Sequence, residues 1–343
     1  MLNLLQSIFG LSDTPQTTVH DDKLIELATE RVIDGTDPRL RAVPGYRKVL
    51  RPGVECAVDY VIGLVEALPR PIELSRRQFS RDERVRALFA SPDHLKDTLL
   101  QSPALQDYLD QRTGIDPENI YALLGVEQQE KRVLGMALEG EIIRRDVAQV
   151  AISFSNHRYM GPMDSDQESR WELEKRAFDF LIQLALEKIT SQRLEQSQML
   201  RQRELLRDKL RALESASWGM DSLMKKTQQT LADPRSVEQQ IARLESELSS
   251  IDTDPVTLDR YLDVISECLM AAPRHLRVAH VTLRLSRMGI KAENADDSGT
   301  ITLELLEIAS SDGRKVIAVP VRIPFSEIPD KPDFLAEASR YLQ

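Results

Sequence analysis

The residues from Met163 to Asp233 form the longest stretch of the chain without a proline, and this stretch most constrains the fold. Between Pro162 and Met288 the only glycine is Gly219. Proline breaks a helix and glycine weakens one, so their absence favours an uninterrupted helix. Ser165 stands where it can cap the first turn. We therefore predict one helix over about 166–231, on the order of 100 Å long at 1.5 Å per residue.

A heptad pattern runs along the second half of this helix. Seven of its ten positions are apolar, and the positions alternate steps of four and three: Met199, Arg203, Leu206, Leu210, Leu213, Ser217, Met220, Met224, Thr227 and Leu231. Asp233-Pro234 ends the run, a second heptad run covers 237–251, and a third helix follows Asp254-Pro255. Such a pattern is typical of coiled coils, and a turn between two heptad helices brings them antiparallel. We expect an antiparallel coiled-coil hairpin over 163–272.

The region 21–130 carries repeated helix-start signals. An Asp or Ser side chain can accept the free amide bonds of a first turn, and a proline in the next position loses no hydrogen bond there. Asp116-Pro117, Ser91-Pro92 and Ser102-Pro103 have this form. We expect a bundle of short helices at about 22–33, 53–68, 82–90, 93–100, 103–112 and 117–129.

Residues 131–162 carry a mixed pattern. Leu134 and Met136 stand at alternate positions, as do Val150, Ile152 and Phe154, which is the spacing of a strand. Apolar residues in the same region are also spaced by three and four, which is the spacing of a helix. β-branched residues and glycines favour a two-stranded hairpin over a helix.

The residues 273–343 change to the period of two that is typical of strands. Apolar residues alternate over 281–285, 301–305 and 317–323, and Pro320 predicts an edge position for the third strand. A helix should follow Pro332. We also consider that the hairpin at 131–162 extends this sheet. The expected fold class is α+β and predominantly helical, with an N-terminal short-helix bundle, a long antiparallel coiled-coil hairpin and a small antiparallel C-terminal sheet with a helix.

Composition narrows the class of protein. The chain has 343 residues and a net charge of −10, which argues against a protein that coats nucleic acid along its whole surface. Cys56 and Cys268 cannot form a disulfide framework. The apolar tail and linker at 1–20 lack the basic residues of a signal peptide and are too short to anchor the chain on a membrane. We expect no transmembrane segment and a cytoplasmic location.

Catalytic and ligand-binding motifs are missing from the sequence. It contains no Walker loop, dinucleotide fingerprint, nucleophile elbow or His-Glu-x-x-His motif. The five histidines are scattered, and Asp164, Asp166 and Glu168 lack the spacing of a calcium loop, so helix capping explains these acids better. We expect no cofactor, no metal and no catalytic residue, and we favour a protein that is not an enzyme. The alternative, an enzyme whose acid–base residues converge from separate domains without a local motif, stays open.

One segment has a local excess of positive charge. Residues 35–90 contain eleven basic and seven acidic residues, a charge of +4, so the rest of the chain carries −14. Arginines beside an aromatic ring can clamp phosphates and stack on bases. Alternatively, these arginines form ion pairs with acidic residues of the rest of the chain, and we favour this interpretation. The candidate phosphate or nucleic-acid residues are Arg39, Arg41, Arg47, Lys48, Arg76, Arg77 and Arg81.

The candidate partner-binding residues are Trp218, Gly219 and Met220. Trp218 is the only aromatic residue between Leu181 and Arg260, and tryptophan is enriched at binding hot spots. We expect a scaffold or adaptor that self-associates or bridges protein partners through the coiled-coil hairpin. The alternative is a nucleic-acid- or phosphate-binding protein that uses the arginines of 39–86 and is dimerised by the coiled coil.

Overall fold

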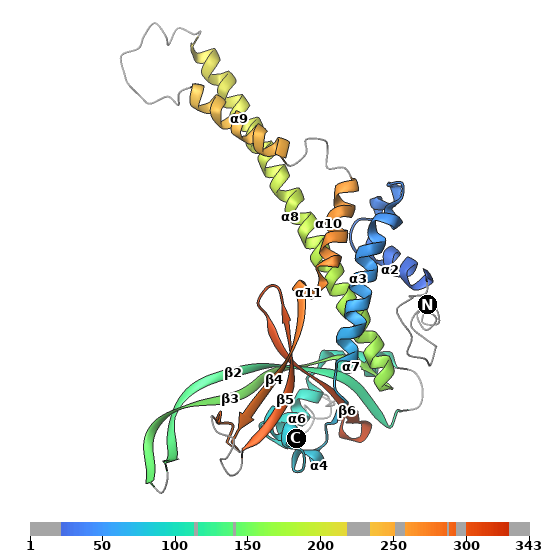
Figure 1. The fold of residues 1–343 in the computed structure, drawn as a ribbon, viewed down its shortest axis with the longest axis vertical. Coiled ribbons are helices and arrows are strands. Elements are labelled where there is room, and N and C mark those ends of the chain that lie inside the picture. The colour runs from blue at the N-terminus through green and yellow to red at the C-terminus, as the bar shows by residue number, and fades with distance from the viewer. Residues whose placement is uncertain are drawn as a thin grey trace, which may run out of the picture. The chain divides into compact units, whose positions relative to one another are not determined.

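The computed structural model describes residues 22–112, 116–139, 142–217, 234–250, 258–286, 288–292 and 300–328. The expectations for the tail at 1–20, for the helix after Pro332 and for Trp218, Gly219 and Met220 lie outside these residues. The chain divides into two compact units: residues 1–57 with 179–271, and residues 58–178 with 272–343. Two helices, α3 (Tyr46–Glu66) and α8 (Asp166–Ser217), belong partly to each unit (Figure 1).

The first unit is helical. It contains α2 (Asp22–Gly35), the 3₁₀ helix η1 (Pro38–Ala42), α9 (Pro234–Ser250) and α10 (Leu258–Met270), with parts of α3 and α8. Ile33, Leu50 and Ile265 are fully buried in its core. At Gly53, α3 passes so close to α10 that a Cβ atom would lie 2.7 Å from the carbonyl oxygen of Ser266.

The long helix is present, but the structure does not show the coiled-coil hairpin expected over 163–272. In α8 the described heptad residues Met199, Leu206 and Leu210 are only half-buried. On the returning side, α9 and α10 are separate helices of 17 and 13 residues. The short α9 meets the distal part of α8 through an ion pair between Arg207 and Glu245 (2.5 Å) (Figure 1). In contrast, α10 packs on α3 and contacts α8 through Tyr261 and Arg193. Heptad spacing predicts an apolar stripe but does not specify the helix that covers it.

The second unit contains one six-stranded sheet, not the small C-terminal sheet that we expected. Its strand order is β3-β2-β6-β5-β4, with β1 parallel to β6 and all other pairs antiparallel. The strands are β1 (Ile72–Glu73), β2 (Asn119–Glu139), β3 (Ile142–Met163), β4 (Leu276–Leu285), β5 (Ile301–Ser310) and β6 (Lys315–Pro324), and the short helices α11 (Ala272–His275) and η3 (Phe325–Glu327) flank β4 and β6.

The helix expected over 117–129 is wrong, because these residues form the start of β2. Residues 122–126 are all buried, since β2 lies between β3 and β6. A short apolar run is compatible with a buried strand or a buried helix. We predicted the helix because Asp116-Pro117 has the form of a helix start, and this prediction was wrong. The hairpin region is indeed two strands, and it belongs to the same sheet as the C-terminal strands.

The expected edge position of the Pro320 strand is also wrong. Pro320 pairs with Leu123 of β2, so β6 lies inside the sheet. On the other side of β6, pairing with β5 ends at Ala318 and pairing with β1 begins at Val321. The proline therefore lies in the gap between the two partner strands β5 and β1. Its missing N–H breaks no hydrogen bond of either strand pair.

One face of the sheet is covered by α4 (Arg76–Phe79), α5 (Glu83–Leu88), α6 (Pro92–Leu100) and α7 (Pro103–Gln111). The expected N-terminal bundle is therefore divided, because these four helices share a core with the sheet and not with α2. Ser91 and Ser102 cap α6 and α7, as the Ser-Pro signals predicted. Within the described ranges, no helix has the length and hydropathy needed to cross a bilayer.

Candidate functional site

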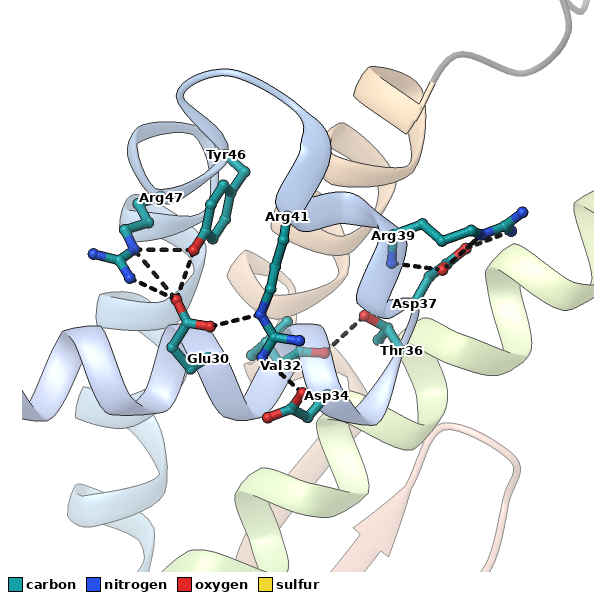
Figure 2. Close-up of polar contacts among 9 residues, drawn as sticks. All are labelled: Glu30, Val32, Asp34, Thr36, Asp37, Arg39, Arg41, Tyr46 and Arg47. Atoms are coloured by element: carbon teal, nitrogen blue, oxygen red, sulfur yellow. Dashed lines mark hydrogen bonds and ion pairs between the residues drawn. The ribbon is translucent and has the colours of Figure 1, made fainter.

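Three of the candidate arginines form ion pairs inside the first unit. Figure 2 shows Arg41 and Arg47 directed at the carboxylate of Glu30, with N···O distances of 3.0 and 2.9 Å. The Tyr46 hydroxyl donates to the same carboxylate (2.7 Å), and this bond, aided by the two arginines, lowers the pKa of Glu30. Arg41 also binds Asp34 at 2.7 Å. Their charges are thus directed at carboxylates of the chain.

Asp37 forms a second ion-pair cluster. Its side chain is only 9% exposed and accepts from Arg39 (2.8 Å) and Arg193 (2.6 Å). The guanidinium of Arg193 also lies over the ring of Tyr261, 4.4 Å from its centroid. The Arg39 hydrogen bond outweighs burial and, with Arg193, holds the pKa of Asp37 well below its usual range. The cluster joins η1, α8 and α10, which is a structural role.

The remaining candidate cations are exposed. Lys48 belongs to the first unit, and Arg76, Arg77 and Arg81 belong to the second, at and after α4. In the described part of the chain, none of these three arginines forms an ion pair. The adjacent ring of Phe79 packs against the core and is half-buried.

The histidines and cysteines do not form a metal site in the described residues. His94 and His157 come together beside Phe89, with ring centroids 4.9 Å apart, and burial lowers the pKa of His157. No group of three or more His, Cys, Asp or Glu residues within the described segments could hold a metal ion. Cys268 is buried, and burial raises the pKa of its thiol, which disfavours the nucleophilic thiolate.

A pocket of about 530 Å³ lies between α5 and the sheet. Its walls include Phe89, Leu285 and Ile301, which are already buried by their neighbours. Arg86 at this pocket is paired with Glu83 (3.6 Å). Met288 also lines the pocket and is 87% exposed, so part of the apolar wall is uncovered.

Sequence reasoning missed the most unusual feature of the second unit, the length of the β2–β3 hairpin. β2 pairs with β6 only from Asn119 to Val126, but its pairing with β3 continues to Glu139 (Figure 1). We call residues 127–139 with the facing residues 142–155 the β arm. Beyond the sheet, the arm is a two-stranded ribbon.

The base of the β arm is fixed to the sheet by residues 288–291, which follow β4. Gly289 accepts from the amide of Ile152, and the amide of Lys291 donates to Val150, both at 2.8 Å. The Lys291 ammonium lies 3.4 Å from Glu130. Gly289 has a φ of +75°, and a Cβ atom there would lie 3.0 Å from the Ile152 carbonyl oxygen, so glycine suits this turn. The arm thus starts from a rigid support.

Two large apolar side chains are uncovered on one face of the β arm, which they share with the exposed Arg132. Leu134 and Met136 point to this face, because alternate residues of a strand share a face, and they are 72% and 67% exposed. On the opposite face the Gln149 side chain lies across Gly135 and donates to the Met136 carbonyl oxygen (3.2 Å). The alternation of Leu134 and Met136 was visible in the sequence, but their exposure was not.

The outer edge of the β arm is interrupted. Two residues of β3, Arg145 and Asp146, face Met136 alone, and Asp146 has a φ of +58°. This is a β-bulge, a device that protects an edge strand from pairing with another strand.

The chain matches no protein-family model, no curated protein and no solved structure.

Proposed function

We propose that this chain is a non-enzymatic protein that binds other protein chains through its β arm. The observation that carries the proposal is the uncovered pair Leu134 and Met136 on the part of the ribbon that lies beyond its contacts with β6, Gly289 and Lys291. A two-stranded ribbon alone is only marginally stable in water, and a partner that covers its apolar face would stabilise it. The rigid base at Gly289 and Lys291 favours binding, because it reduces the conformational entropy lost by the arm.

A cytoplasmic location is part of this proposal. Cys56 and Cys268 are free thiols, and a reducing compartment maintains this state.

The nucleic-acid alternative depends on a different observation. Arg76, Arg77 and Arg81 are exposed and, among the described side chains, not engaged by carboxylates. Arg39, Arg41 and Arg47 contribute less to this alternative, because phosphate would have to compete with Asp37, Asp34 and Glu30.

The size of the assembly in cell extract tests the proposed function. Tagged full-length protein from the cells that produce it would be separated by size exclusion, beside the double variant Leu134→Lys/Met136→Lys. A matched control is Leu205→Lys, because Leu205 of α8 is 70% exposed, as Leu134 is. We expect the wild type and the control to elute as an assembly and the double variant at the monomer mass. Equal elution of all three proteins would refute the proposal.

A further inference from the structure

Two histidines hold residues 89–91, the connection between α5 and α6, and we infer that acid releases this connection when both of them bind a proton. His157 of β3 donates from Nε2 to the carbonyl oxygen of Leu88 (2.8 Å). The amide of Ala90 donates to Nδ1 of His94 on α6 (3.2 Å). One imidazole therefore binds the backbone just before the α5–α6 connection, and the other binds the connection itself.

The bond to His94 exists only while this imidazole is neutral. A neutral imidazole has one N–H donor and one acceptor nitrogen, whereas an imidazolium has two donors and no acceptor. Because Nδ1 of His94 accepts from the amide of Ala90, the proton of this ring is on Nε2. A second proton on Nδ1 would direct two N–H groups at each other, and the hydrogen bond would be lost.

The surroundings of His157 disfavour its charged form. Its ring is stacked on the ring of Phe89, with the centroids 4.8 Å apart, and Phe89 is only 1% exposed. Burial of the imidazole, together with the charge of His94, lowers the pKa of His157, although the Leu88 carbonyl oxygen and the Phe89 ring both attract its positive charge. The closed connection is therefore built around a neutral His157.

The two imidazoles lie close together without a carboxylate to balance their charges. Their centroids are 4.9 Å apart in an edge-to-face arrangement, so two imidazolium ions would repel each other. Among the described side chains, neither ring forms an ion pair with a carboxylate. The other titratable residues of the elements around the pair are exposed or bind a different partner: Glu83, Arg84 and Arg86 of α5, Asp93, Lys96 and Asp97 of α6, Arg158 and Tyr159 of β3, and Glu127 of β2.

The sign of the pH effect follows from these contacts. A histidine whose pKa is lowered by folding binds its proton more tightly in the released form, so release is favoured as pH falls below 6.5, the ordinary value. At pH 5, a histidine that stays neutral in the closed form favours release by at most about thirtyfold, and we expect at least about tenfold from the pair. Leu88, Phe89 and Ala90 also line the pocket beside α5, so release opens this wall of the pocket.

Hydrogen–deuterium exchange of the purified full-length chain measures the release. The amides of residues 88–95 would be followed at pH 8 and pH 5, corrected for the intrinsic pH dependence of exchange and compared with the amides of β6 in the same unit. We expect the wild type to lose protection over 88–95 by at least about tenfold at pH 5, while β6 keeps its protection.

Two substitutions keep both hydrogen bonds and remove the titration. Asparagine Oδ1 takes the place of histidine Nδ1 as an acceptor, and glutamine Nε2 takes the place of histidine Nε2 as a donor. The double variant His94→Asn/His157→Gln should therefore show equal protection at pH 8 and pH 5. The matched control is His280→Asn, at an exposed histidine of β4, and it should lose protection at pH 5 as the wild type does.

Three results would overturn the inference. One is a wild type with the same protection over 88–95 at both pH values, a comparison that needs no variant and holds even if the double variant does not fold. Another is a loss of protection at pH 5 that the double variant shares. The third is an equal loss in β6, because the whole unit would then unfold in acid and the α5–α6 connection would not be released by itself.

Discussion

Replacing Glu174 with glutamine should stabilise the protein at pH 8. Glu174 lies on α8 within the second unit, one turn after Arg170. The Arg170 guanidinium is committed to the end of α3, where it donates to the carbonyl oxygens of Val65 (2.9 Å) and Pro69 (3.0 Å). Burial, together with the nearby charge of Glu66, raises the pKa of Glu174 to about 7.

The sign and the size of the effect follow from this pKa. A carboxyl group whose pKa is raised by folding binds its proton more tightly in the folded state, so stability falls as pH rises from the unfolded pKa, 4.5, to the folded pKa, about 7. One pKa unit corresponds to about 1.4 kcal/mol, which sets an upper limit of about 3 kcal/mol. Water at the exposed part of the carboxyl group reduces this, and we expect about 1–3 kcal/mol at pH 8. Glutamine carries no charge and removes the penalty.

Urea unfolding at pH 5 and pH 8, followed by the fluorescence of Trp171 in a Trp218→Phe background, measures this difference. Trp171 belongs to α8 in the same unit. The wild type should lose stability between the two pH values, and Glu174→Gln should lose less. Glu195→Gln, at an exposed position of the same helix, is the control and should behave as the wild type. A Glu174→Gln protein that is no more stable than the wild type at pH 8 would refute the reasoning.

Three further predictions concern other contacts. Asp37→Asn should lower the free energy of unfolding at pH 7 by about 1–3 kcal/mol, because two arginines lose their carboxylate. Since folding holds the pKa of Asp37 well below 3.8, its value in the unfolded chain, the difference should be smaller at pH 3 than at pH 7 but still present, as urea unfolding at the two pH values would show. Gly53→Ala should lower the free energy of unfolding by about 1–3 kcal/mol, because its Cβ would meet the Ser266 carbonyl oxygen. Gly63→Ala on the same helix has open space and should raise the free energy of unfolding by about 0.5–1 kcal/mol. Thermal unfolding distinguishes the two variants. In about 20 mM salt, the fluorescence anisotropy of a labelled oligonucleotide should show no binding to the wild type or to Arg76→Glu/Arg77→Glu. Salt-sensitive binding to the wild type that is lost in the variant would instead support the nucleic-acid alternative.

The long helix could be predicted from the sequence, but its packing could not. The proline-free stretch and the cap at Ser165 give a helix that begins at Asp166, and the Glu168 amide does donate to the Ser165 hydroxyl (3.2 Å). Heptad spacing describes one surface of α8 only. Which helix covers that surface depends on contacts far apart in the chain, such as that of Ser266 with Val49, which no local pattern encodes.

The sheet shows the same limit. Alternation located the strands at 276–285, 301–310 and 315–324. In β6 the apolar residues alternate in the sequence although residues 317–321 are all buried. β2 was misread at its start because a central strand is apolar on both faces, and this removes the period of two. Pro320 was misplaced because its tolerance depends on where β5 stops and β1 begins, which is a property of the register.

The residues of the candidate site could likewise be identified from the sequence, but their contacts could not. Local composition identified the arginines at 39–48 but not their pairing with Glu30, Asp34 and Asp37. Nor did it identify Arg193, which binds Asp37 from 156 residues away in the sequence. The β arm was recognisable as a hairpin. That it extends beyond its neighbours followed only from the shorter β6.

The most direct test of the β arm as a binding surface is site-specific photo-cross-linking in the intact cell. A photoreactive amino acid would replace Met136 on the apolar face of the arm or, as the control, the equally exposed Leu205 of α8. Irradiation should give a protein adduct at Met136 and none at Leu205, and the mass of the adduct identifies a second copy or another chain. Absence of a protein adduct at Met136 would contradict the proposal that this chain acts by binding proteins through its β arm.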